Sequence, residues 1–251
     1  MGQPPIRLLS QDKEMRTKVF DSSREMAEAA AEAAGDLLRA AIGARGRAFL
    51  VMATGNSQLA FLAALAGQAG IDWARVTAFQ LDDYIGLPRR HPAALAEFLR
   101  KNVIARVQPG EVHLLDEETP EEMSALISRQ QVDVAFVGVG ENGHLAFNDP
   151  PADFTTESPY LRVKLDRRCR QQQVGEGWFA SIEEVPREAV SMSIRQILKS
   201  RAILCVVPER RKAEAVRDCF ANAVSPLHPA SILQEHDGAI LFLDRESASL
   251  L

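Results

Sequence analysis

Residues 138–150, Gly-Val-Gly-Glu-Asn-Gly-His-Leu-Ala-Phe-Asn-Asp-Pro, place one histidine among acids, amides and glycines directly after an apolar run. Such a mixture adds little to a hydrophobic core. An imidazole titrates near neutral pH and can both give and take a proton. We therefore predict that His144 is an acid–base group, although a structural histidine is the simpler alternative. The other candidate residues of this stretch are Gly140, Glu141, Asn142 and Asp149.

A second candidate site, Ala-Thr-Gly-Asn-Ser at 53–57, lies between an apolar strand pattern and a helical pattern. Glycine allows a tight turn there, and asparagine or serine can cap the helix. Free backbone N–H groups at a helix N-terminus favour an anion such as phosphate. The alternative is an ordinary strand-to-helix turn with a capping residue, which explains the same residues. The candidate phosphate ligands are Thr54, Gly55, Asn56 and Ser57.

A third candidate site is the acidic pair Asp82 and Asp83, which follows the predicted strand Val76 to Leu81. Two adjacent carboxylates repel each other, and this repulsion raises the pKa of one of them toward the range of a useful base. Asp83 is also a candidate substrate ligand. Equally, either aspartate can cap a turn that leads to Gly86.

Three cations are candidates for completing an anion pocket, with a solvated surface charge as the alternative for each. Arg168 and Arg170 lie in an irregular stretch, and Lys212 opens a predicted helix after an apolar strand. A metal site is not favoured, because His144 lacks a second histidine at i+4 and a nearby cysteine pair. The sequence has neither a Walker loop nor a Gly-x-Gly-x-x-Gly fingerprint, so we expect no nucleotide cofactor.

Strand-like and helix-like patterns alternate from end to end of the chain. A capping pair at Ser22 and Glu25 precedes an alanine-rich helix, and helices are expected over 91–107 and 230–236. Near-continuous apolar strands between helices predict a Rossmann-like, three-layer, doubly wound α/β fold with a mostly parallel sheet and helices on both faces. We expect a single domain over 1–251, with a lid-like irregular segment at about 150–186.

Bulk composition excludes several classes of protein. The chain has 251 residues, 46% of them hydrophobic and 25% charged, and a net charge of −5, so no general attraction to nucleic acid or to an anionic membrane is expected. No apolar run approaches the length of a membrane span. Three scattered cysteines favour reduced thiols. We therefore predict a cytoplasmic protein that binds a small molecule and forms, at most, a homo-oligomer.

Taken together, these stretches resemble glucosamine-6-phosphate deaminases, within a wider group that also contains 6-phosphogluconolactonases. The resemblance covers nearly the whole chain, and Phe147-Asn148 is similar to the deaminase branch. The matching stretches are 52–57, 79–88, 138–150, 185–190, the region around Lys212, and 231–244.

The resemblance implies an aldose–ketose isomerisation coupled to the loss of ammonia, with neither metal nor organic cofactor. Asp82 would take the C2 proton, His144 would assist ring opening, and Asp149 would support the histidine. The implied phosphate ligands are Thr54, Gly55, Asn56, Ser57, Arg168 and Lys212, with Arg170 as the alternative arginine. Deaminases of this family run somewhat beyond the position of Leu251, so we expect no allosteric control.

One departure from the family pattern concerns the histidine. The family has an aspartate two residues before it, where this chain has Asn142, and the acid Glu141 lies one position earlier. An amide orients an imidazole but stabilises the imidazolium less than a carboxylate does. Either Glu141 and Asp149 replace the missing acid, or the substrate and the step differ. The alternative functions are a 6-phosphogluconolactonase-like hydrolase and a sugar-phosphate-binding module without catalysis.

Overall fold

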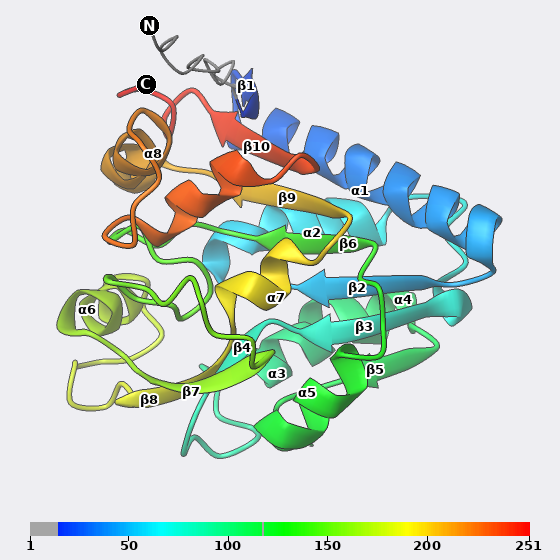
Figure 1. Cartoon of the computed structure of the whole chain (residues 1–251), viewed down its shortest axis with the longest axis horizontal. Helices are drawn as coiled ribbons and strands as arrows, with labels where there is room; N and C mark the ends of the chain where they lie inside the picture. The colour runs from blue at the N-terminus through cyan, green and yellow to red at the C-terminus, as the bar shows by residue number, and fades with distance from the viewer. Residues whose placement is uncertain (1–14, 117) are drawn as a thin grey trace, which may run out of the picture.

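The computed structural model describes residues 15–116 and 118–251. Within these residues, seven strands form one parallel sheet in the order β1-β10-β9-β6-β2-β3-β5 (Figure 1). The inner strands β2, β6 and β9 are apolar along their whole length, as expected for a sheet that is covered on both faces. The strands of this sheet are β1 Arg16–Phe20, β2 Ala48–Met52, β3 Val76–Gln80, β5 Glu111–His113, β6 Val134–Val137, β9 Ala202–Val207 and β10 Ala239–Asp244.

Helices cover both faces of this sheet, and alternate strand residues contact the two helical layers. In β6, Val134 and Phe136 belong to the cluster that includes α1 and α2, whereas Ala135 and Val137 belong to the cluster that includes α5, α7 and α8. The doubly wound, three-layer α/β architecture is therefore confirmed. These helices are α1 Ser23–Arg45, α2 Leu59–Ala66, α5 Pro120–Ile127, α7 Ile194–Leu198 and α8 Ala213–Phe220.

The chain reverses its direction of travel across the sheet between β2 and β6. From β2 it runs outward to β3 and β5, then crosses back to β6 and continues to β9 and β10. The loops that follow β2 and β6 therefore leave on opposite sides, and a crevice opens at the carboxyl ends of the strands. In Figure 1 these ends point to the left.

A second, antiparallel sheet, which the sequence patterns did not predict, lies near this crevice. It consists of β4 (Asp82–Tyr84), β8 (Glu188–Met192) and β7 (Tyr160–Lys164), and it pairs Asp82 with Ser191. The segment 150–186 is consequently more regular than expected, because it contains β7 and α6 (Arg167–Gly175). That this segment moves as a lid stays a prediction.

Two predicted helices differ in detail. The helix expected over 91–107 begins only at Leu95, because the Asp83 carboxylate accepts the N–H groups of Leu95 and Ala96 and so fixes its first turn. It runs as α3 (Leu95–Leu99), the π-helical stretch η3 (Arg100–Ile104) and α4 (Ala105–Val107). The segment 230–236 is the 3₁₀ helix η5 (Pro229–Glu235). At α1, Ser22 caps the helix by accepting the N–H of Glu25, as predicted.

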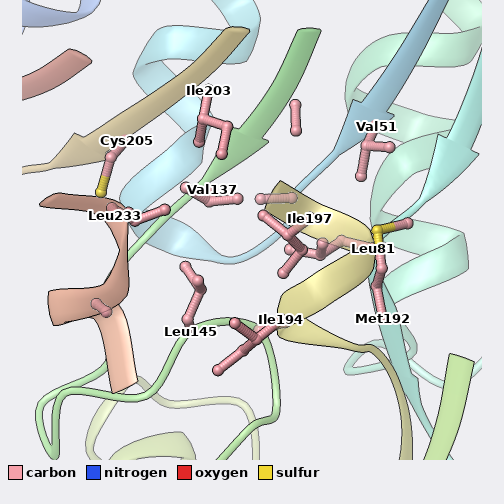
Figure 2. Close-up of a cluster of buried hydrophobic side chains, with 14 of the residues drawn as sticks. Val51, Leu81, Val137, Leu145, Met192, Ile194, Ile197, Ile203, Cys205 and Leu233 are labelled. Carbon is pink, nitrogen blue, oxygen red and sulfur yellow. The ribbon is translucent and has the colours of Figure 1, made fainter. Parts of the chain in front are cut away.

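A buried hydrophobic cluster fixes the positions of two catalytic candidates, Asp82 and His144, through their sequence neighbours. Leu81 and Leu145, the sequence neighbours of Asp82 and His144, both lie in this cluster with Val137, Ile194 and other apolar residues (Figure 2). Both leucines are almost fully buried, and each such burial stabilises the fold by about 1.5–3 kcal/mol. In the part of the chain that the structure describes, no helix combines the length and the apolar character needed to span a bilayer.

Asp133 provides a test of how β2 is held beside β6. Its buried carboxylate accepts the N–H of Phe49 at 2.9 Å and pairs with Arg45. Asp133→Ala should lower the free energy of unfolding by about 2 kcal/mol, because the N–H of Phe49 loses its partner inside the protein. Asp133→Asn keeps an acceptor and should lose less in urea unfolding. Equal losses for the two variants would show that this hydrogen bond is unimportant.

Candidate active site

A pocket of about 580 Å³, with space open to solvent included, lies at the carboxyl ends of β2 and β6. The three stretches singled out from the sequence all contribute to it. Its polar and charged lining residues are Thr54, Ser57, Asp82, Tyr84, His144, Gln172, Gln173, Glu176, Trp178 and Lys212, with Gly55, Gly138 and Gly140 among the others.

The loop after β2 forms one wall of the pocket through Thr54, Gly55 and Ser57. Gly55 has φ = 99°, a conformation that favours glycine, and the 3₁₀ turn η1 (Asn56–Gln58) leads directly into α2. Asn56 does not line the pocket. Its Nδ2 donates to the carbonyl oxygen of Glu176 at 3.0 Å, so this residue ties the loop to the end of α6.

Asp82 lies at the start of β4, is 7% exposed and lines the pocket. Burial raises its pKa to about 8, and the charge of Asp83 adds to this rise. A carboxyl group with such a pKa exchanges a proton near neutral pH, which is what a general acid–base group requires.

Asp83, in contrast, points away from the pocket and has a structural role. Its carboxylate accepts the N–H groups of Tyr84, Leu95 and Ala96 and the side-chain amide of Gln80. It does not line the pocket, and that it binds substrate stays a prediction. The two adjacent aspartates thus divide their roles, because successive side chains of a strand face opposite ways.

His144 and Asp149 form a buried pair at the end of the glycine-rich loop. His144 Nδ1 lies 3.3 Å from Asp149 Oδ1. Asp149 also accepts the Nδ2 group of Asn142 and the backbone N–H of Asp166, each at 2.9 Å. Burial alone would raise the pKa of Asp149, but His144 and these hydrogen bonds outweigh burial and lower it. Asp149 is therefore held as a carboxylate beside the imidazole.

Asn142, which stands where the family has an aspartate, supports both His144 and Asp149 through hydrogen bonds. The Asn142 Oδ1 atom accepts the backbone N–H of His144 at 3.1 Å, and its Nδ2 atom holds Asp149, so the amide supports the carboxylate from behind. The Glu141 side chain is 39% exposed, lies 3.7 Å from Arg211 and does not line the pocket. Of the two acids considered as replacements, the structure brings only Asp149 to the imidazole.

Lys212 supplies the buried cation of the pocket. It is 2% exposed, and its Nζ lies 3.9 Å from Glu176 Oε1. Burial lowers the pKa of Lys212, while the Glu176 carboxylate opposes this shift. The two candidate arginines do not line the pocket: Arg168 is exposed on α6, and Arg170 donates to the carbonyl oxygens of Ile182 and Val185.

The wall that α6 and the residues after it provide was not predicted from the sequence. Gln172, Gln173, Glu176 and Trp178 line this side of the pocket. The available signal was three consecutive glutamines at 171–173, followed after Val174 by Gly-Glu-Gly, a pattern that a surface helix does not require. Tyr84 was also missed, and its hydroxyl is buried without a hydrogen-bond partner among the described residues.

One group of residues has the composition of a metal site. His144, Asp149 and Cys169 offer ligand atoms that lie within 4.8 Å of one another. Burial raises the pKa of the Cys169 thiol well above its ordinary value, with the nearby carboxylates adding to the rise. Metals bind the thiolate, so a metal ion at this place would have to displace the thiol proton of Cys169.

Gly140 packs against the imidazole and offers a test of its placement. A Cβ at this position would lie 2.2 Å from His144 Cε1. Gly140→Ala should therefore displace the ring from Asp149 and shift the side-chain ¹⁵N resonances of His144 in a histidine-detected NMR spectrum. Gly175→Ala is the matched control, since nothing lies within 4 Å of its Cβ position. Unchanged His144 resonances in Gly140→Ala would contradict the described packing.

Comparisons with known proteins agree with this geometry. A family model described as glucosamine-6-phosphate isomerases/6-phosphogluconolactonase matches residues 21–242. A glucosamine-6-phosphate deaminase of Exiguobacterium sibiricum is 34% identical over 187 residues, which are 72% of this chain and 73% of that protein. Another from Pseudarthrobacter chlorophenolicus is 30% identical over 249 residues, which are 94% of this chain and 93% of that protein.

Solved structures give the same result. A monomeric glucosamine-6-phosphate deaminase superposes with a TM-score of 0.83 at 28% identity, over 94% of this chain and 100% of that chain. A 6-phosphogluconolactonase from Trypanosoma brucei superposes with a TM-score of 0.78 at 14% identity, over 95% of this chain and 99% of that chain, and therefore shares the fold. The resemblance drawn from the strand-end motifs is thus confirmed, and the chain belongs to the family of glucosamine-6-phosphate isomerases and 6-phosphogluconolactonases.

Proposed function

We propose that this protein is an amino-sugar-phosphate deaminase/isomerase, which converts glucosamine 6-phosphate or a close analogue to fructose 6-phosphate and ammonia. The observation that carries this proposal is the position of Asp82, a carboxyl with a pKa of about 8, in the same pocket as His144 and Lys212. The relatives named glucosamine-6-phosphate deaminase support the same activity.

The phosphoryl group of the substrate binds at the loop after β2. Thr54, Gly55 and Ser57 offer backbone N–H groups and hydroxyls at the start of the helical segment, and Lys212 adds a buried positive charge. Such a combination holds an anion without any nucleotide-binding motif. Asn56 supports this loop indirectly through its hydrogen bond to Glu176.

His144 opens the pyranose ring. The imidazole transfers a proton between the anomeric hydroxyl and the ring oxygen, giving the open-chain aldehyde. Asp149 holds the imidazole in one orientation and stabilises the imidazolium that forms, as the carboxylate does in hydrolytic triads. Asn142 and the backbone of Asp166 keep Asp149 in place.

Asp82 then moves the proton that distinguishes the aldose from the ketose. Its carboxylate takes the proton from C2, and the same carboxyl returns it to C1. During this transfer the C1 oxygen takes up a proton and the amino nitrogen gives one up, so the product has a hydroxyl on C1 and an imine at C2. Water adds to the imine carbon, ammonia leaves, and the 2-ketose phosphate remains. A base whose pKa is raised by burial suits the weakly acidic C–H bond.

Lactone hydrolysis is the second candidate, because several structural neighbours are 6-phosphogluconolactonases. That reaction would use the same anion-binding loop after β2 (residues 53–57, the anion loop) and the same histidine, but it needs no base for a carbon-bound proton. The buried, pocket-lining Asp82 therefore favours the deaminase reading.

Location and assembly belong to the same proposal. The described residues include three free, buried cysteines, which fits the reducing cytoplasm that we propose as the protein's location. A homo-oligomer stays a prediction.

Substitution of Asp82 separates the two reactions. With glucosamine 6-phosphate or galactosamine 6-phosphate, the wild type should release ammonia, and Asp82→Asn should lower kcat by about a thousandfold, because an amide cannot accept the C2 proton. Hydrolysis of 6-phosphogluconolactone, followed as acid release, is the parallel assay. Acid release from the lactone alone, retained in Asp82→Asn, would instead identify a lactonase.

The pH dependence of ammonia release tests the raised pKa of Asp82. The base must be deprotonated in the free enzyme, so kcat/KM should rise with pH and level off above a midpoint near the pKa of about 8. Steady-state rates between about pH 6 and about pH 9 measure this midpoint. A profile that is flat over this range, or that falls through it, would contradict Asp82 as the base.

A further inference from the structure

Glu176 is a buried carboxylate in the anion pocket that the proposed mechanism does not use. Its side chain is 6% exposed, and it lines the same pocket as Thr54, Ser57 and Lys212. A buried charge requires compensation by hydrogen bonds or by an opposite charge. The hydrogen-bond donors and cations around the Glu176 carboxylate show which ligand it would exclude from the pocket.

Both oxygens of the Glu176 carboxylate are held. Gln172 Nε2 donates to Oε1 at 2.8 Å, and Trp178 Nε1 donates to Oε2 at 3.3 Å. Two cations face Oε1: Arg211 at 3.6 Å and Lys212 at 3.9 Å. The carboxylate thus lies against the same lysine that is available to a substrate phosphoryl group.

The carboxylate and a phosphoryl group cannot both lie against Lys212 at low cost. Each is an anion, and like charges at contact distance in a partly buried pocket repel strongly. We propose that Glu176 is an internal competitor for the anion site: its carboxylate occupies the place beside Lys212 in the free protein, and the phosphoryl group binds by displacing it. This inference rests on the proposed function only in the identity of the displacing ligand.

The local chain permits this displacement. Glu176 follows the last residue of α6 and lies between Gly175 and Gly177, and nothing lies within 4 Å of the Cβ position of either glycine. Gly177 has φ = 81°, so the backbone already turns there. The departing side chain gives up its hydrogen bonds from Gln172 and Trp178, while the Asn56 amide can keep its bond to the Glu176 carbonyl.

Calorimetric titration of the full chain with inorganic phosphate tests the competition. Glu176→Gln keeps the size of the side chain and removes its charge, so phosphate should bind about tenfold more tightly than to the wild type. The matched control is Glu209→Gln, because Glu209 contacts Arg211 at 2.6 Å but does not line the pocket. This control should stay within about twofold of the wild type.

Weaker or unchanged phosphate binding in Glu176→Gln would overturn the proposal. Weaker binding would mean that Glu176 acts as a fixed part of the site that keeps Lys212 charged. A change of equal size in Glu209→Gln would also overturn it, because a general change of surface charge would then explain the result.

Fluorescence provides a second measurement that does not depend on the stability of Glu176→Gln. The chain has two tryptophans, Trp73 and Trp178, so Trp73→Phe leaves Trp178 as the reporter. Saturating phosphate should change the Trp178 emission, because the indole N–H loses Glu176. Emission that does not change while calorimetry shows binding would contradict displacement.

The ammonia assay separates this inference from the proposed function. An active wild type whose Glu176→Gln variant fails to gain affinity refutes the competition and leaves the deaminase function standing. An inactive wild type whose Glu176→Gln variant gains affinity supports the competition and refutes the deaminase function.

Discussion

The pairing of β6, β2 and β3 as neighbouring parallel strands is the constraint on which the site depends. Leu50 is level with Val134, and Met52 is level with Gln80. The three strands therefore end at the same edge of the sheet, and the segments that follow them meet there. These segments carry the anion loop, Asp82 and His144. A shift of register in either pair would move one of these segments away from the other two and would also turn its side chains to the other face.

Two aspartates near this edge show how environment divides chemical roles. Burial, together with the charge of Asp83, raises the pKa of Asp82. Asp149 is also buried, but it faces His144 and receives hydrogen bonds from Asn142 and Asp166, so its pKa is lowered. One carboxyl is thereby suited to exchange a proton, and the other is suited to remain an anion and orient an imidazole.

The remaining wall of the pocket comes from a part of the chain that is added to the sheet. The strands β4, β7 and β8 form a small antiparallel sheet, and α6 follows β7 directly (Figure 1). This wall brings Gln172, Glu176 and Trp178 to the anion loop. It joins the site to the small sheet, because Asp166 caps α6 and also donates its backbone N–H to Asp149. The His144–Asp149 pair and the part of the pocket around Lys212 thus share one support.

The sequence by itself determined the fold class of this protein and marked its candidate site residues. Apolar strands between helical patterns determined the doubly wound α/β fold, because buried parallel strands and amphipathic helices each leave a periodic signature. Glycines followed by polar residues at strand ends marked the loop at 53–57, Asp82 and His144, since such residues contribute little to a core. The resemblance to one family followed from the same stretches.

Only the tertiary structure decided which side chains share the pocket. The sequence does not show that Asp82 and Asp83 have different roles. In the structure, successive side chains of the strand face opposite ways, and the Asp83 carboxylate accepts the first N–H groups of α3. Arg168 matched an expected phosphate ligand, yet it lies on the exposed side of α6, while Glu176 lies inside. Sequence patterns report the period of an element and the chemistry of its residues. The direction of a single side chain, and the charge that faces it from a distant element, arise from packing between segments far apart in the chain.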